Sequence, residues 1–174
     1  MGSAPDSVSG GSMAKAKPIP DLSAEDSYAE AAARIVSVRA GELTENAQGV
    51  LDTGDIERVH DMRVATRRLR AALEIFEPCF PAEAYAEALA EVKRLADALG
   101  ERRDRDVAIA ALHVFNDQMP SPDRRGVASL IERLQTEQDD ANRDLAPLVE
   151  EPKLAELGGT MDDLVTAERV ETDA

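Results

Sequence analysis

Apolar residues recur at intervals of three and four along almost the whole chain, and this periodicity constrains the fold more than any other feature. The run Met62, Ala65, Leu69, Leu73 and Phe76 shows it most clearly. Such spacing places side chains on one face of an α-helix, and no segment shows a convincing strand-like alternation. Aromatic residues make up only 3% of the sequence, whereas strands favour aromatic and β-branched residues. We therefore predict an all-α protein, an antiparallel bundle of four to five main helices.

Glycine, proline and capping residues divide the periodic segments into individual helices. The first helix is predicted to start at Ser23, a capping residue, and to run to about residue 50. Asp55 is a good N-cap for a second helix that reaches about Phe76. A third helix fits residues 82–99, and Gly100 is typical of a residue that ends a helix.

The second half of the chain is predicted to continue in the same way. Asp104 is expected to cap a fourth helix that ends near Phe115. Ser121 as a cap and Pro122 at the first helical position then predict a fifth helix that ends near Pro147. A short helical piece is expected around residues 153–157.

The ends of the chain have a different composition from its middle. Residues 1–21 are rich in Gly, Ser and Pro, which predicts a disordered N-terminal tail. Residues 166–174 are expected to form a frayed C-terminal tail, so the predicted helical domain covers residues 22–165. Cys79 is the single cysteine, and no apolar run is long enough to span a bilayer. We therefore expect a cytoplasmic protein with no membrane partner.

Cations are concentrated on one face of the second predicted helix. At 100° per residue, His60, Arg63, Arg67 and Arg70 form a single ridge about 80° wide, opposite the apolar face. We call these four residues the basic ridge; Arg68 lies beside it. Like charges at such spacing destabilise a helix by about 0.2–0.5 kcal/mol per pair. The compensating negative charge is therefore expected from elsewhere.

Two sources of that negative charge remain open from the residues alone. Carboxylates of a neighbouring helix or a partner subunit would make the protein an interaction or scaffold module. An anionic ligand would make it an anion-binding module. The whole chain carries a net charge of −15, which is a poor match to nucleic acid, and it lacks the aromatic side chains that stack on bases. Nucleic acid is therefore excluded as the primary partner, although a nucleotide or phosphoprotein remains a weaker possibility.

Two segments resemble a known family. "VHDMRVATRRLRAALEIF" carries the HxxRxxxRRLR pattern of the CHAD family, the conserved histidine α-helical domain, and "LADALGERRDRDV" resembles its second motif. The resemblance implies an all-helical, non-catalytic protein that binds inorganic polyphosphate, for which phosphate or sulfate can substitute, and that associates with polyphosphate granules. Transferred by motif, the binding positions are His60, Arg63, Arg67, Arg68, Arg70, Lys93 and Arg103, with Arg94, Arg102 and Arg105 as peripheral candidates.

The resemblance also bears on two acids and on the assembly. Asp104 and Asp106 match acidic positions of the second motif, and we interpret them as a helix cap and its dipole partner or as salt-bridge partners that orient the arginines. Family members usually have two similar halves, and nothing after residue 106 resembles the motif of the second half. The chain therefore matches about one half of a full domain, which favours a homodimer with twofold symmetry if it is not a fragment.

The remaining chemically active side chains give no sign of catalysis. His113 is expected to be exposed and without function, and Cys79 to be packed or half-exposed. The two histidines lack the spacing of zinc ligands, and Asp139 and Asp140 are adjacent, which places them on different flanks of a helix. We therefore predict no catalytic residues, no metal and no cofactor.

Overall fold

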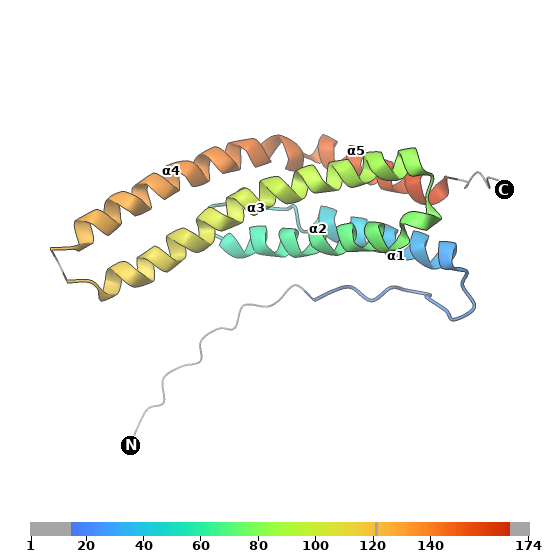
Figure 1. Ribbon diagram of the computed structural model, residues 1–174, viewed down its shortest axis with the longest axis horizontal. Coiled ribbons are helices and arrows are strands. Elements are labelled where there is room, and N and C mark those ends of the chain that lie inside the picture. The colour runs from blue at the N-terminus through green and yellow to red at the C-terminus, as the bar shows by residue number, and fades with distance from the viewer. Residues whose placement is uncertain (1–14, 121, 168–174) are drawn as a thin grey trace, which may run out of the picture.

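A computed structural model describes residues 15–120 and 122–167, and within these ranges the chain folds into five α-helices and one short 3-10 helix. The order of elements is α1 (Tyr28–Glu45), α2 (Ile56–Phe76), η1 (Glu77–Cys79), α3 (Ala82–Gln118), α4 (Arg124–Val149) and α5 (Glu151–Thr166). The described residues contain no strand. The prediction of an all-α bundle is therefore confirmed (Figure 1).

The starts of α1 and α2 show how local sequence sets helix boundaries. Ser27 rather than Ser23 caps α1: its side chain accepts a hydrogen bond from the backbone N–H of Glu30, whose carboxylate accepts one from the N–H of Ser27. The predicted start of the first helix was thus four residues too early, and its predicted end near residue 50 was too late. Asp55 is the N-cap residue of α2 as predicted, but its carboxylate pairs with Arg58, 3.0 Å away, and makes no capping hydrogen bond.

α3 runs unbroken through the position where two separate helices were expected. Gly100 lies inside it, and Asp104 is an exposed mid-helix residue rather than a cap, so both predictions were wrong. An internal glycine costs a helix only about 1 kcal/mol, and packing outweighs this cost because the buried stripe continues past it. That stripe has alternating spacings of three and four and comprises Tyr85, Ala88, Val92, Leu95, Leu99, Arg102, Asp106 and Ile109.

α4 and α5 also differ from expectation. The predicted cap Ser121 lies outside the described residues, and Pro122 belongs to the turn before α4 rather than to its first helical position. Pro147 lies inside α4, which ends two residues later. α5 is a helix of 16 residues instead of the short piece expected, since Leu154, Leu157, Met161 and Leu164 give it a buried face.

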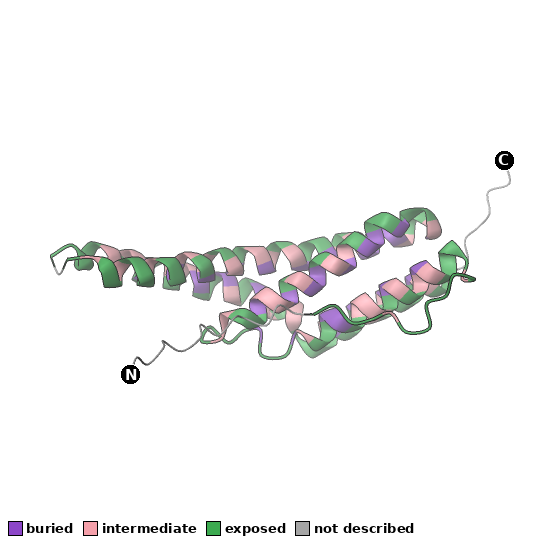
Figure 2. Ribbon diagram, turned by 90° about the horizontal axis from the view of Figure 1, so that it is seen from below, coloured by how far each residue is buried: buried purple, intermediate pink, exposed green. Residues whose placement is uncertain are grey.

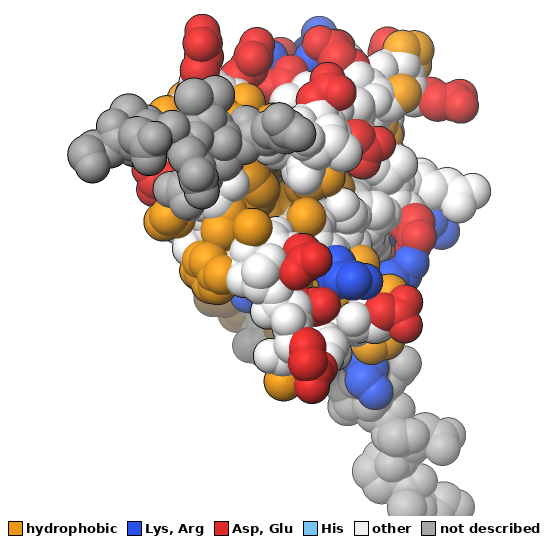
Figure 3. Space-filling view, turned by 90° about the vertical axis from the view of Figure 1, so that its right-hand side faces the viewer, with side chains coloured by type: hydrophobic (Ala, Val, Ile, Leu, Met, Phe, Trp, Pro, Cys, Tyr) orange, Lys and Arg blue, Asp and Glu red, His pale blue; other side chains and the backbone are white. Residues whose placement is uncertain are grey.

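The core lies where α1, α2, α3 and α5 pack together with the C-terminal end of α4 (Figure 2). The apolar face predicted for α2 is buried from Met62 to Phe76. At one end of the bundle hydrophobic side chains gather at the surface with acidic side chains around them (Figure 3). At the other end α3 and α4 extend well beyond α1 and α2 as a two-helix projection.

The segments predicted as tails are only partly within the described residues. Residues 1–14 and 168–174 lie outside them. Within the predicted N-terminal tail, Lys17 contacts α1: its backbone N–H donates to the buried carboxylate of Glu42, and its ammonium group lies 2.5 Å from Glu45. Arg39 holds the other oxygen of Glu42 at 2.7 Å. Tyr28, at the start of α1, packs its ring 5.0 Å from that of Phe76.

Candidate functional site

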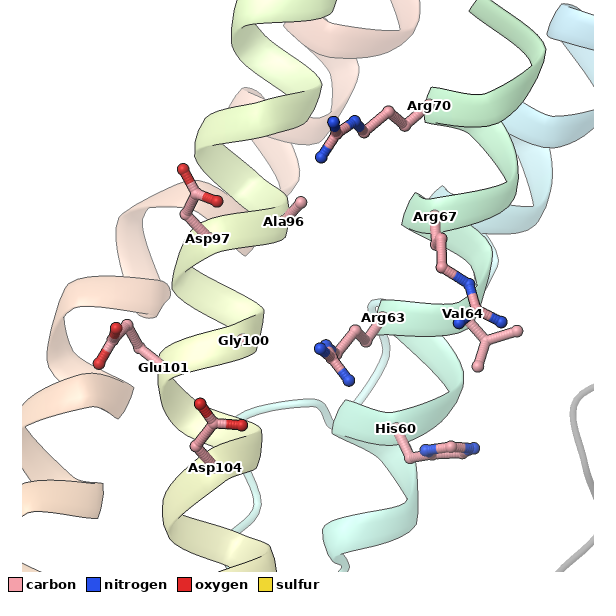
Figure 4. Close-up of a pocket in the computed structure, with 10 residues that line it drawn as sticks. All are labelled: His60, Arg63, Val64, Arg67, Arg70, Ala96, Asp97, Gly100, Glu101 and Asp104. Atoms are coloured by element: carbon pink, nitrogen blue, oxygen red, sulfur yellow. The ribbon is translucent and has the colours of Figure 1, made fainter. Parts of the chain in front are cut away.

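The basic ridge of α2 forms one wall of an open cleft whose other wall is α3. The cleft has a volume of about 640 Å³. Its α2 wall consists of His60, Arg63, Val64, Arg67 and Arg70, and its α3 wall of Ala96, Asp97, Gly100, Glu101 and Asp104 (Figure 4). All four residues of the ridge therefore line one concave surface, as their helical spacing indicates.

The charges of the ridge are only partly compensated. Arg63 and Arg67 are exposed and His60 is half-buried, and within the described part of the chain none of the three makes a hydrogen bond or ion pair. Arg70 differs, because its Nε donates to Glu74 one turn later at 2.8 Å, and this bond raises the pKa of its guanidinium. The guanidinium groups of Arg63 and Arg67 thus face solvent, and their N–H donors have no partner within the described residues.

The side chains of the two walls have different orientations. Arg63 and Arg70 reach from α2 towards α3, while His60 and Arg67 turn away from α3 (Figure 4). Opposite the two inward arginines, α3 presents Ala96 and Gly100, and a Cβ at Gly100 would meet no atom within 4 Å. The small residues therefore keep the space beside the guanidinium groups open.

Three carboxylates also border the cleft, on the α3 side. Glu101 points towards α4 and pairs with Arg105, so it is engaged away from the ridge. Asp97 and Asp104 are exposed, and among the described residues neither forms an ion pair with the ridge, although the charge of Asp97 acts on Arg70, whose pKa is raised mainly by its hydrogen bond to Glu74. The cleft therefore has a basic wall on α2 and a wall on α3 whose charged residues are all acidic, so the guanidinium groups of the α2 side are the groups able to hold an anion.

Comparison with known protein families decides which family this is. The family model described as CHAD domain matches residues 34–174, most of the chain. The chain belongs to the CHAD family. Neither the curated proteins nor the solved structures include a match to it. In this CHAD domain the first motif lies on α2 and the second on α3, so the cleft lies between the two segments that carry the resemblance.

The other basic candidates have different environments. Lys93 is exposed on α3, seven residues before Gly100 and thus on the cleft side of the helix. Arg68 is half-buried beside the ridge, and its charge helps to lower the pKa of Glu42 on α1. Arg103 donates from Nη1 to the carbonyl of Ile56 at 2.9 Å, so it secures the start of α2.

The peripheral candidates lie away from the cleft. Arg94 is exposed and borders a small cavity with Leu148 and Lys153, between α3 and the last two helices. Arg105 is half-buried between Glu101 and Glu137 and faces α4.

Arg102 requires a correction, because the CHAD fold buries it completely. Its side chain is 0% exposed, and its Nε donates to Asp106 at 2.9 Å. Asp106 also accepts a hydrogen bond of 2.6 Å from Gln138 of α4, and Arg102 donates to Asn142. Asn142 in turn donates to the carbonyl of Leu51, before α2. Arg102 is therefore part of an internal network, and the interpretation of Asp106 as a salt-bridge partner is confirmed.

Sequence reasoning missed the α3 wall of the cleft. Gly100 was interpreted as the end of a helix and Asp104 as a cap, so neither was placed opposite the ridge. A signal was present: Lys93, Asp97, Gly100 and Asp104 are separated by four, three and four residues, which places them on one face of a continuous helix.

The remaining expectations concern metals, membranes and two side chains. His113 is exposed and Cys79 half-buried, as predicted. In residues 15–120 and 122–167, no group of three His, Cys, Asp or Glu side chains is arranged to hold a metal ion. No helix in those ranges is long and apolar enough to cross a membrane.

Proposed function

We propose that the cleft between α2 and α3 binds inorganic polyphosphate and catalyses no reaction on it. The observation that carries the proposal is the pair Arg63 and Arg67, exposed on a concave surface without an acidic partner in the described chain. Membership of the CHAD family supports the same ligand, because polyphosphate binding is consistent with that family. Phosphate or sulfate is expected to occupy the same positions more weakly.

The mechanism we propose is electrostatic and local. A guanidinium group offers parallel N–H donors that match two phosphate oxygens, whereas an ammonium group acts as a point charge. The ridge covers about 15 Å from His60 to Arg70, at 1.5 Å per residue, so it can contact several units of an extended chain. Lys93 extends the basic surface on the α3 side. Because the protein as a whole carries a net charge of −15, binding depends on this surface and not on overall attraction.

The proposal predicts a steep dependence on salt and on the ridge. Contacts with three or four phosphates give a slope of log K against log salt of about −2 to −3, taking about 0.7 per contact as for single strands. The double substitution Arg63→Glu and Arg67→Glu is expected to weaken binding of long-chain polyphosphate at least tenfold, equivalent to about 1.4 kcal/mol, and to flatten the slope. Titration calorimetry at several salt concentrations measures both quantities.

A matched control separates the ridge from net charge. Arg133 and Arg143 are 70% and 75% exposed on α4, so Arg133→Glu with Arg143→Glu changes the total charge equally and leaves the cleft intact. We expect this control to bind nearly as the unaltered protein does. Equal losses in the two double variants would contradict a site on the ridge. Stronger competition by nucleotides than by long chains would instead point to a nucleotide ligand.

The scaffold alternative makes a different prediction for the same arginines. It requires them to be paired with carboxylates, and on the ridge only Arg70 has such a pair within the described residues. We therefore favour a ligand over an internal partner. A cytoplasmic location and association with polyphosphate granules form part of the proposal, and fluorescence microscopy of the tagged wild-type and double-variant proteins tests them.

A further inference from the structure

The projecting parts of α3 and α4 form a distinct unit, which we call the arm: residues 107–118 and 124–136. The arm extends past the ends of α1 and α2, so its two helices contact mainly each other (Figures 1 and 2). Ile109 and Ile131 are its buried apolar side chains, and neither belongs to the main core. The arm is closed at its tip, because Arg124 donates to the carbonyls of Met119 and Asp117 at 2.8 and 3.1 Å.

The α3 half of the arm is poor in charge and exposes several apolar side chains. From Val107 to Asn116 it contains no Lys, Arg, Asp or Glu, and His113 and Asn116 are its polar residues. Ile109 is buried, whereas most of the other side chains of this stretch are exposed or half-buried. Val107 is 51% exposed and Val114 61%, and Phe115 is 48% exposed on a neighbouring flank. Contiguous exposed apolar surface marks an interaction site.

The distribution of charge indicates what covers this surface. The arm and the turn that joins its two helices, residues 107–136, contain three acidic and three basic residues, so this part is neutral in a chain of net charge −15. Two copies of so acidic a protein repel each other over most of their surface. The arm is where they can approach without that cost. The apolar end of the bundle in Figure 3 differs, because acidic side chains surround it.

We propose that two copies of this chain associate through their arms and pack them side by side into a four-helix bundle about a twofold axis. Val107 and Val114 lie seven residues apart on one line of α3 and form the centre of the contact. Twelve residues of helix measure about 18 Å, so the interface lies below the standard of about 800 Å² per partner. We therefore expect a weak dimer whose population rises with concentration. This inference does not depend on polyphosphate.

Sedimentation velocity without ligand, over a wide range of protein concentration, tests the proposal. The wild-type protein is expected to shift from monomer to dimer, and Val107→Glu with Val114→Glu to remain monomeric at every concentration. The control Ile75→Glu with Leu22→Glu replaces side chains that are also exposed, 62% and 47%, but lie outside the arm; it is expected to dimerise normally. A wild-type protein that stays monomeric throughout, or a control that dissociates equally, would overturn the proposal.

A cross-linking experiment locates the contact directly. Ala111 is exposed and lies midway between Val107 and Val114, so Ala111→Cys in a Cys79→Ser background places one thiol near the proposed twofold axis. We expect mild oxidation to give a covalent dimer in high yield. The matched variant Ala155→Cys, exposed on α5, is expected to give little. Equal yields from the two positions would overturn the assignment of the arm as the interface.

Discussion

Removing the carboxylate of Asp106 is expected to destabilise this protein far more than removing any exposed acid. Asp106 and Arg102 are completely buried as an ion pair in the middle of α3, and Gln138 of α4 donates to the same carboxylate oxygen. The substitution Asp106→Ala leaves the guanidinium of Arg102 buried with Asn142 as its remaining protein partner. It also leaves the amide of Gln138 without an acceptor.

The size of the effect follows from this burial. Breaking a buried ion pair by removing one partner costs about 3–5 kcal/mol, a large part of the 5–15 kcal/mol that stabilises a typical domain. At 2–4 °C per kcal/mol for a chain of this size, the melting temperature is expected to fall by roughly 10 °C. The exposed pair of Arg143 and Asp140, with side chains 75% and 56% accessible, is worth less than about 1 kcal/mol.

Urea unfolding followed by circular dichroism measures these differences, with Asp140→Ala as the control. A second variant, Arg102→Met with Asp106→Leu, removes both charges and is expected to recover most of the lost stability, because apolar replacements of a buried pair are often neutral or stabilising. Recovery is favoured here since Arg102 Nη2 and Asp106 Oδ2 have no hydrogen-bond partner in the described chain. A loss below 1 kcal/mol in Asp106→Ala would refute the reasoning.

Two further predictions concern Gly100 and Glu42. Gly100→Ala is expected to stabilise the protein by up to about 1 kcal/mol, since the added Cβ meets nothing within 4 Å, and urea unfolding measures this gain. Gly100→Leu is expected to fill the cleft and weaken polyphosphate binding without unfolding the helix, and titration calorimetry measures this loss. Burial opposes ionisation of Glu42, but hydrogen bonds from Lys17 and Arg39 outweigh it and lower its pKa. Glu42 therefore contributes stability above its unfolded-state pKa and loses it as the pH falls through the folded-state pKa, and Glu42→Gln should reduce the loss of stability that unfolding experiments detect below about pH 4.5.

The sequence predicted those features that depend on one helix alone. The boundaries of α2 and the face that carries the basic ridge followed from capping and periodicity, and both are present in the structure. Gly100 was misjudged because glycine stops a helix only when packing does not continue beyond it. Arg102 was misjudged as a consequence, since a break at Gly100 hides the three–four repeat that runs from Leu95 and Leu99 to Arg102 and Asp106. The cleft itself requires two helices to be placed relative to each other, which no single periodicity specifies.

The repeat along α3 also determines how the length of this molecule can vary. Inserting one residue into α3 turns everything beyond it by about 100°, which would separate Asp106 from Gln138 or Ile109 from α4. Adding or removing seven residues in the arm portion of each helix instead preserves the facing pairs and changes the reach of the arm by about 10.5 Å. The cleft lies nearer the bundle and remains unaffected. The length of the arm and the geometry of the cleft can therefore vary independently. Design or natural selection can lengthen or shorten the arm in steps of seven residues while the cleft stays the same.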